Sequence, residues 1–174
     1  MKIKLVWFPF LLLMFLYLGG CATAAKPQAM VVQSPGIIST NENLIGKMHI
    51  SGVTGGKKTN PMWTSKVDSL AFRQALEKSL KIAGYLSASE NEAPYKVSAN
   101  LKKLDQPLFG ATFNVTSTVD YLISSPNGDR AIPITATGTA KVSDAWAGVS
   151  RLKIANERSI QENIKAFLQK LNSF

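Results

Sequence analysis

Cysteine and histidine are nearly absent from this chain, which has one of each among its 174 residues. Because Cys21 is the only cysteine, no internal disulfide can form, and the fold depends on packing. A zinc site or a Ser-His-Asp triad would have to use His49, and no G-x-S-x-G motif accompanies it. We therefore predict no metal site and no cofactor, and we expect His49 to be solvated on the polar face of a strand.

Acidic residues are also sparse, with 11 against 20 lysines and arginines. They are scattered along the chain, and Glu90 and Glu92 lie in a polar turn before a strand, a spacing typical of solvent-exposed side chains. Folding could still bring distant carboxylates together for general acid–base chemistry. The sequence itself predicts no catalytic residue, and we expect a protein that is not an enzyme.

The longest hydrophobic run, Leu5–Leu18, covers 14 residues, fewer than the roughly 20 that a membrane-spanning helix needs. Lys2 and Lys4 precede this run, and two glycines follow it. A basic start, an apolar stretch and a small-residue exit are the pattern of a secretory signal peptide. We predict that residues 1–20 are removed on export.

The signal closes on the residues Leu18, Gly19, Gly20 and Cys21, a string that resembles the lipobox of bacterial lipoproteins. The resemblance implies that Cys21 becomes the N-terminus and carries the acyl chains that anchor the protein in a membrane. Ala22 follows, where an aspartate retains enterobacterial lipoproteins in the inner membrane. The outer membrane, with the domain in the periplasm, is therefore the expected location. The alternatives are inner-membrane retention and an ordinary signal peptide with an incidental cysteine.

Positive charge dominates what remains after cleavage. Without Lys2 and Lys4 the mature chain has 18 basic residues and 11 acidic ones, a formal charge of about +7. An exported, lipid-anchored protein does not meet nucleic acid, so anionic lipid head groups or lipopolysaccharide phosphates are the expected partners of this charge. A role in solubility alone is the alternative. The candidate anion contacts are Lys57, Lys58, Lys96, Lys102 and Lys141.

Residues 21–43 show no sustained hydrophobic period and contain Ala, Pro, Gln, Ser and Gly. We predict that they form the lipidated cysteine and a flexible tether, which would reach on the order of 25 Å from the membrane. Its one apolar patch, Met30-Val31-Val32, could instead pair with the folded part. Residues 44–174 are predicted to form a single periplasmic domain.

Hydrophobic periodicity predicts the elements of this domain. Alternating apolar and polar residues predict strands over 47–51, 95–102, 113–123 and 132–142. Helical spacing predicts helices over 65–84 and 149–171, the first opened by a capping box from Ser65 to Asp68. Pro133 has no amide hydrogen and is expected at an edge or a bulge. The prediction is an α+β two-layer sandwich of order β-α-β-β-β-α, with two helices on one face of a mainly antiparallel four-stranded sheet.

The glycine-rich loop over 52–59 lies between a strand and a helix, as a phosphate-binding P-loop does. Its spacing does not fit, because Gly52 and Gly56 are separated by three residues where the motif requires four. Lys58 also occupies the place of the Mg²⁺-binding hydroxyl. The remaining alternatives are a mobile connector and a loop that binds an anion through backbone amides.

Two aromatic stretches are candidate partner contacts. Trp63 follows Asn60-Pro61-Met62, and Phe109 lies in a loop between two strands, each near Pro or Gly residues that suit exposed anchors. The alternative is that Trp63 packs the start of the helix into the core and that Phe109 caps the sheet edge. Trp146, before the last helix, is expected to pack in the core or at its rim.

The layout resembles small Gram-negative outer-membrane lipoproteins. The string over 72–80, followed by Gly84-Tyr85-Leu86, is similar to uncharacterised lipoproteins of the YajG type, and the order of elements is similar to the lipopolysaccharide-assembly LptE family. The resemblance implies a non-catalytic accessory or docking subunit of an envelope assembly or transport system, with a protein partner. The alternative is a periplasmic module that binds anionic lipid, lipopolysaccharide or glycan. The oligomeric state stays open.

Overall fold

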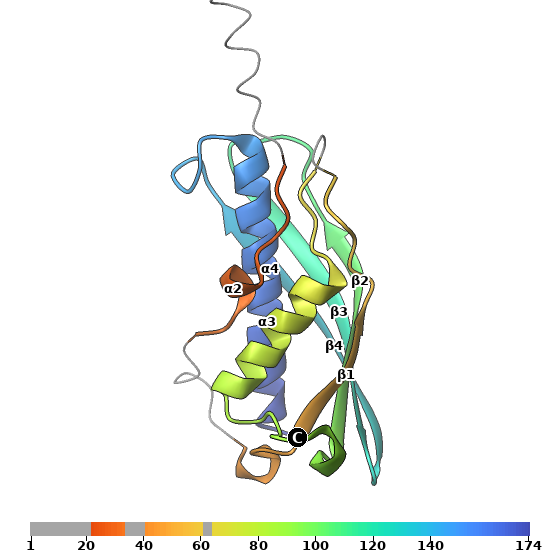
Figure 1. The fold of residues 1–174 in the computed structure, drawn as a ribbon. Helices are drawn as coiled ribbons and strands as arrows, with labels where there is room; N and C mark the ends of the chain where they lie inside the picture. Colours follow the sequence, from red (N-terminus) through yellow and green to blue (C-terminus); the bar gives the residue numbers. More distant parts are fainter. Residues whose placement is uncertain (1–21, 34–40, 61–63) are drawn as a thin grey trace, which may run out of the picture.

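The chain folds into two layers, a four-stranded sheet and helices that cover one of its faces (Figure 1). The computed structural model describes residues 22–33, 41–60 and 64–174. Strand β1 is parallel to β2, and the pairs β2-β3 and β3-β4 are antiparallel, so the predicted α+β class is confirmed. The predicted element order is confirmed from β1 onward, and a short third helix, α2, precedes it. The elements are α2 Pro27–Met30, β1 Met48–Thr54, α3 Ser69–Ile82, β2 Tyr95–Asp105, β3 Phe113–Ser125, β4 Gly128–Ala140 and α4 Gly148–Leu171, with 3-10 turns at Glu42–Leu44 and Glu90–Glu92.

The strands bury alternate residues, as their sequence period predicts. On β3, Val115 and Val119 face the helices, whereas Thr116 and Thr118 lie on the open side. We call this open side the outer face of the sheet; its residues on β3 and β4 include Asn114, Thr116, Thr118, Thr135, Thr137 and Thr139. Threonine hydroxyls pair across the two strands at 2.9 and 3.3 Å. Pro133 lies on β4, an edge strand, where its missing amide hydrogen interrupts no central ladder.

Helix α3 begins at Ser69, four residues after its predicted start at Ser65. The Asp68 carboxylate is the actual N-cap and accepts a hydrogen bond from the Ala71 amide at 2.7 Å. The preceding residues are held extended, because the Lys57 amide donates to the Val67 carbonyl at 2.8 Å and Thr59 bonds both backbone groups of Lys66. These contacts with the glycine-rich loop prevent Ser65 from opening the helix.

Helix α4 packs across β3 and β4, with the predicted stripe of Ile160, Ile164, Phe167, Leu168 and Leu171 fully buried. Its Phe167 ring stacks on Tyr121 of β3 with centroids 4.1 Å apart. Close approach depends on Gly138 of β4, where a Cβ atom would lie 2.1 Å from the Ser159 nitrogen. The helix and the sheet therefore touch through backbone at this position.

Residues 22–33 are part of the fold, so the prediction that the whole segment is a flexible tether is wrong for them. Met30 and Val31 are fully buried in the main core, beside the helices. The Val32 amide donates to the Ser79 hydroxyl at 3.0 Å, and the Gln161 side chain donates to the Val31 carbonyl at 2.8 Å. The apolar patch thus pairs with the domain, which was the alternative. Residues 34–40 lie outside the described residues.

The molecule is elongated, and its two ends differ (Figure 1). Strands β2 and β4 run toward the end at which the described chain begins, and α4 starts there. We call this the Ala22 end; it comprises residues 22–25, the β2-β3 loop 106–112 and the β4-α4 loop 141–147. The C-terminal Phe174 lies at the other end, where its ring meets Tyr95 at 5.9 Å between centroids.

Candidate functional site

The Ala22 end carries the most exposed large apolar side chains of the described residues. Leu108 and Phe109 in the β2-β3 loop are 93 % and 85 % exposed, and Trp146 in the β4-α4 loop is 88 % exposed. Phe109 therefore does not cap the sheet edge, and the prediction that Trp146 packs in the core or at its rim is wrong. The exposure of Phe109 agrees with a contact residue, and its predicted partner role stays a prediction.

Arg151 in the first turn of α4 holds the two loops together. Its Nη1 atom donates to the carbonyl oxygens of Ala145 and Trp146 at 3.1 and 2.6 Å, and its Nη2 atom donates to Gly110 at 3.1 Å. The guanidinium also lies over the Phe113 ring, 5.3 Å from its centroid. A planar donor fork can bond several carbonyls at once. The exposed side chains are thus presented on fastened loops.

A second network ties the N-terminal segment to the same end. The Ser65 hydroxyl donates to the Thr23 carbonyl at 2.7 Å, and the Ser65 carbonyl accepts from the side-chain amides of Gln106 and Asn156 at 2.8 and 3.0 Å. Gln106 also accepts from the Lys66 ammonium. Gln106 is two residues before Leu108, so these bonds place the first described residues beside the exposed loop.

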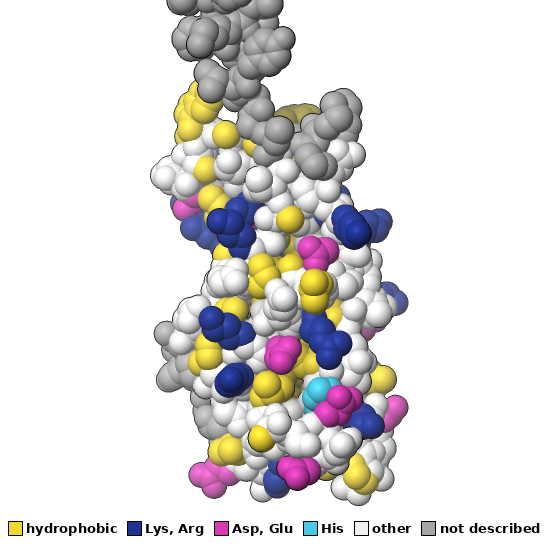
Figure 2. All heavy atoms as spheres, viewed as in Figure 1, with side chains coloured by type: hydrophobic (Ala, Val, Ile, Leu, Met, Phe, Trp, Pro, Cys, Tyr) yellow, Lys and Arg dark blue, Asp and Glu magenta, His cyan; other side chains and the backbone are white. Residues whose placement is uncertain are grey.

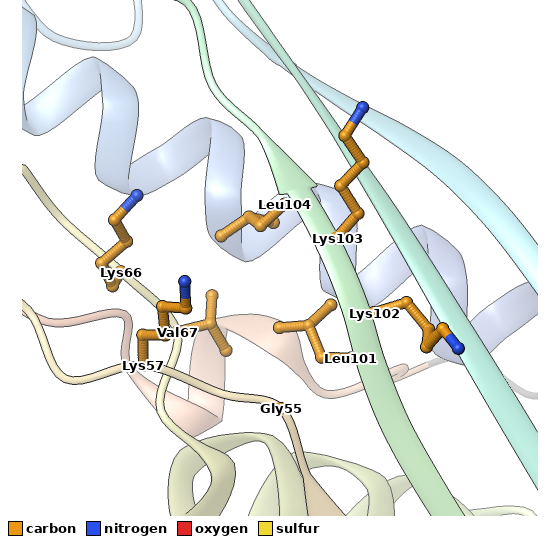
Figure 3. A pocket seen from close by; sticks show the side chains of 8 residues that line it. All are labelled: Gly55, Lys57, Lys66, Val67, Leu101, Lys102, Lys103 and Leu104. Atoms are coloured by element: carbon orange, nitrogen blue, oxygen red, sulfur yellow. The ribbon is translucent and has the colours of Figure 1, made fainter.

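A small basic groove lies between the glycine-rich loop and β2 (Figure 3). Its volume is about 190 Å³, and it is lined by Gly55, Lys57, Lys66, Val67, Leu101, Lys102, Lys103 and Leu104. Lys103 pairs with Asp105 at 2.7 Å, and Lys102 extends away from Lys57 and Lys66 toward Asp120, 3.5 Å away. Drug-sized ligands occupy about 300–1,000 Å³. This groove has room for a small anionic group only.

The five candidate anion contacts do not form one site. Lys96 and Lys102 are six residues apart on β2, about 20 Å at the rise of a strand. Lys141 follows the end of β4, two strands away from β2. Lys58 lines a separate open hollow of about 640 Å³ with Ala22, Ala24 and Leu70 among its other lining residues. Only Lys57 and Lys102 share the groove, and Lys96 lies toward the opposite end of the molecule.

The glycine-rich loop makes structural contacts. A Cβ on Gly55, whose φ is +79°, would lie 2.2 Å from the Leu101 carbonyl oxygen, and one on Gly56 would lie 2.3 Å from the Ser69 nitrogen. The amides of Gly56 and Lys57 already donate to the Ser69 hydroxyl and to the Val67 carbonyl. These two amides are not available to an anion, and the glycines allow the loop to approach β2 and α3 closely.

The titratable groups show where charge is used structurally. His49 pairs with Glu90 at 3.2 Å and is half-buried rather than fully solvated. Burial raises the pKa of Tyr121, whose hydroxyl donates to the Asn163 side chain at 3.0 Å. Hydrogen bonds from Arg158 and from the Lys141 amide lower the pKa of Asp144 to about 2.

Within residues 22–33, 41–60 and 64–174, no group of three His, Asp or Glu side chains is placed to hold a metal ion.

Several predicted residues lie outside the described part of the chain: Leu18, Gly19, Gly20, Cys21 and Trp63. In the part that is described, no helix is both long and apolar enough to cross a bilayer. Leu108 and Arg151 were not singled out from the sequence. A leucine followed by phenylalanine and glycine in a turn was the available signal for Leu108, whereas nothing local marks Arg151 as a link between loops.

Comparison with known proteins gives structural similarity only. No family model matches the sequence. No curated protein matches it either. A solved structure of a candidate lipoprotein from Caulobacter crescentus CB15 is similar over 57 % of this chain and 80 % of its own, at 15 % identity and a TM-score of 0.43. A Xanthomonas campestris protein of family DUF330 covers 78 % of this chain and 94 % of its own, at 9 % identity and a TM-score of 0.48. A hypothetical protein of Chlamydia trachomatis covers 74 % and 94 %, at 9 % identity and a TM-score of 0.47.

Proposed function

We propose that the chain is a non-catalytic lipoprotein, acylated at Cys21 and anchored in the outer membrane with its domain in the periplasm. Its proposed role is that of an accessory subunit that docks onto a protein of an envelope assembly or transport system. The observation that carries the proposal is the lipobox-like string Leu18-Gly19-Gly20-Cys21, which stands directly before Ala22, a buried residue of the fold.

The outer face of the sheet supports docking rather than capture of a ligand. The helices cover the other face, and the threonine pairs Thr116–Thr137 and Thr118–Thr135 order the surface across β3 and β4. An ordered surface loses little conformational entropy when a partner covers it. Both strands extend over 13 residues, which offers a long contact surface.

The basic groove favours a second candidate function, a module that binds an anionic lipid or glycan. Lys57 and Lys66 lie on one side of the groove and Lys103 on the other. Because the volume is about 190 Å³, the bound group would be a single phosphate or sugar acid rather than a whole lipid. Binding through exposed lysines would weaken with salt.

Two measurements test the proposal. Metabolic labelling with an alkyne fatty acid should label the wild-type protein and leave Cys21→Ser unlabelled. A photo-crosslinker at Thr137 on the outer face should then give one discrete protein adduct in cells, which Thr135→Arg should abolish by placing a charge beside the contact. A crosslinker at Gln169, exposed on α4, serves as the matched position. Equal adducts from both positions, or none from Thr137, would reject docking through the outer face.

A further inference from the structure

We infer that the Ala22 end lies directly on the membrane surface, with Leu108, Phe109 and Trp146 inserted into the interfacial layer of the bilayer. The first of its three arguments rests on the proposed function, because it takes Cys21 to carry the acyl chains. The domain would then rest on the membrane beside its acyl chains instead of being held away from it by a long tether. In this orientation the long axis of the molecule points away from the membrane, and the end with Phe174 lies farthest from it (Figure 1).

The first argument is the length of chain between the anchor and the fold. Ala22 and Ala25 are buried at 5 % and 4 % exposure, and the Thr23 carbonyl accepts from Ser65. The Lys26 amide donates to the Glu157 carboxylate at 2.8 Å, which fixes the segment to α4. Consecutive Cα atoms are 3.8 Å apart. Acyl chains on Cys21 would therefore bring the Ala22 end to the bilayer, and no free chain of tether length separates them.

The second argument is the chemistry of the exposed side chains. Tryptophan is enriched at the interface between lipid and water, and Trp, Phe and Leu are the side chains that interfacial amphipathic segments bury there. Leu108 and Phe109 are adjacent in sequence, and Arg151 links their loop to the loop of Trp146 through Gly110. In Figure 2, hydrophobic atoms are exposed at the upper end of the described part, and others are spread over the middle of the visible face. The fastened loops are ordered before contact, so little entropy is lost on insertion.

The third argument is charge. Lys57, Lys66 and Lys103 line the groove on the same half of the molecule, and Lys141 borders the loop of Trp146. In Figure 2, lysine and arginine side chains are spread along the visible face, including its upper half. The exposed apolar side chains of Leu108, Phe109 and Trp146, with basic side chains farther along the molecule, match a bilayer in which the anionic phosphates lie outside the layer of acyl chains. Acidic residues lie at both ends: Glu42, Glu90, Glu92 and Asp129 at the opposite end, and Asp105 and Asp144 at the Ala22 end, where they pair with Lys103 and Arg158.

Fluorescence quenching by lipid tests the seating directly. The acylated mature chain with Trp63→Phe retains Trp146 as its only tryptophan, and it is reconstituted in phosphatidylethanolamine–phosphatidylglycerol vesicles that contain a lipid brominated at acyl positions 6 and 7. We expect Trp146 to be quenched. The control chain combines Trp63→Phe and Trp146→Phe with Asn127→Trp, which places the fluorophore in the β3-β4 turn at the opposite end, and it should not be quenched. An unquenched Trp146, or equal quenching of both, would overturn the inference.

Vesicle partitioning of the non-acylated Cys21→Ser chain separates the inference from the anchor. Leu108→Ser with Phe109→Ser should weaken partitioning about tenfold or more, because two apolar side chains lose their burial in lipid, whereas Ile45→Ser at the opposite end should not. Equal urea midpoints will show that all three chains fold alike.

The outcomes for the anchor and for the membrane contact are distinguishable. If Cys21 is not acylated in cells but the double variant still partitions less than its parent, the membrane contact is supported and the proposed acylation is rejected. If the acylated chain floats with vesicles but the double variant partitions like its parent, the acylation is supported and the membrane contact is rejected. If the double variant loses the protein crosslink from Thr137 while its vesicle binding is unchanged, these side chains belong to a protein contact and the inference is rejected.

Discussion

Arg151 donates a hydrogen bond to the carbonyl oxygen of Gly110 at 3.1 Å, and this contact joins the start of α4 to the β2-β3 loop. The same guanidinium bonds the carbonyls of Ala145 and Trp146. One buried side chain thereby sets the position of three exposed apolar ones on two loops. The surface formed by Leu108, Phe109 and Trp146 is consequently held in place by specific hydrogen bonds. Its rigidity can be tested separately from its binding to a membrane or a protein.

Arg151→Ala should loosen both loops. The substitution removes three charge-assisted hydrogen bonds, each of which contributes about 1.5–3 kcal/mol. Amide exchange should therefore rise about tenfold or more at Asp144 and Ala145, whose amides bond Lys141. Hydrogen exchange read by mass spectrometry or NMR measures this change, and the anisotropy of Trp146 fluorescence in a Trp63→Phe background should fall with it.

Arg151→Lys distinguishes geometry from charge at this position. Lysine keeps the positive charge but donates from a single nitrogen, so it cannot reach carbonyls on both loops at once. It should resemble the alanine variant. The exposed Gln169→Ala on the same helix is the control and should exchange like wild type. Unchanged exchange in both Arg151 variants would show that the loops are held by other contacts.

Gly138→Ala should destabilise the fold by about 1–3 kcal/mol or more, because the added Cβ would lie 2.1 Å from the Ser159 nitrogen and 2.5 Å from the Ala155 carbonyl oxygen. Backbone atoms cannot move aside as a flexible side chain can, so α4 would have to shift away from β4. Urea unfolding followed by circular dichroism measures the free energy of unfolding.

Gly52→Ala is the matched control for Gly138. A Cβ there meets nothing within 4 Å, and the residue has no positive φ. The same change should leave stability unaltered or raise it by a few tenths of a kcal/mol through the unfolded state. Similar losses in the two variants would mean that close packing of α4 on β4 is not what requires glycine.

Met30→Ala tests whether residues 22–33 belong to the folded unit. Met30 is fully buried in the main core, and truncating a buried methionine to alanine costs about 2–5 kcal/mol. The loss should appear in the global unfolding transition, because the segment is bonded to both long helices through Ser79 and Gln161. Chemical denaturation measures it.

Gln28→Ala is the matched control, because Gln28 lies in the same segment, three residues before Val31, but is exposed. This substitution should leave the unfolding transition unchanged. A docked segment separates these two variants by several kcal/mol, whereas a free tether would make them equivalent. Equal stability of Met30→Ala and Gln28→Ala would thus restore the tether and remove the first argument for a seated domain.

The elements that could be predicted from the sequence are those in which apolar residues repeat at a regular spacing. Strands such as β3 alternate over many residues, and the stripe on α4 from Ile160 to Leu171 repeats at helical spacing, so each can be read from its own segment. The Met30-Val31-Val32 patch has no period. Its partners, Ser79 and Gln161, are distant in sequence, and only the packed helices show where the patch belongs.

The candidate site was harder to predict because it depends on direction as well as on residue type. Alternation places Lys96 and Lys102 on one face of a strand, but it cannot say that they lie toward different ends of the molecule. An aromatic residue in a loop, such as Trp146, is buried or exposed according to how the loop turns. At this loop the turn is set by Arg151 and by Asp144, which bonds Arg158.

The pH dependence of stability should reveal the ion pair that fastens the loop of Trp146. The Asp144 carboxylate accepts from both terminal nitrogens of Arg158 at 2.8 and 2.9 Å and from the Lys141 amide at 2.8 Å. These hydrogen bonds lower its pKa from 3.8 to about 2. A carboxyl whose pKa is depressed by folding stabilises the native state above its unfolded pKa and loses that contribution as pH falls through the folded value.

Wild type and Asp144→Asn should therefore differ in free energy of unfolding by a constant amount above about pH 5, and the difference should shrink as pH falls from 3.8 toward about 2. Denaturation series across this range measure the difference, and NMR titration of the Asp144 carboxyl gives its pKa directly. Arg158→Ala should return that pKa toward 3.8, since the largest stabilising hydrogen bond is lost. A difference between wild type and Asp144→Asn that stays constant down to pH 2 would mean that the carboxylate is not held by Arg158, and that the loop carrying Trp146 is positioned by Arg151 alone.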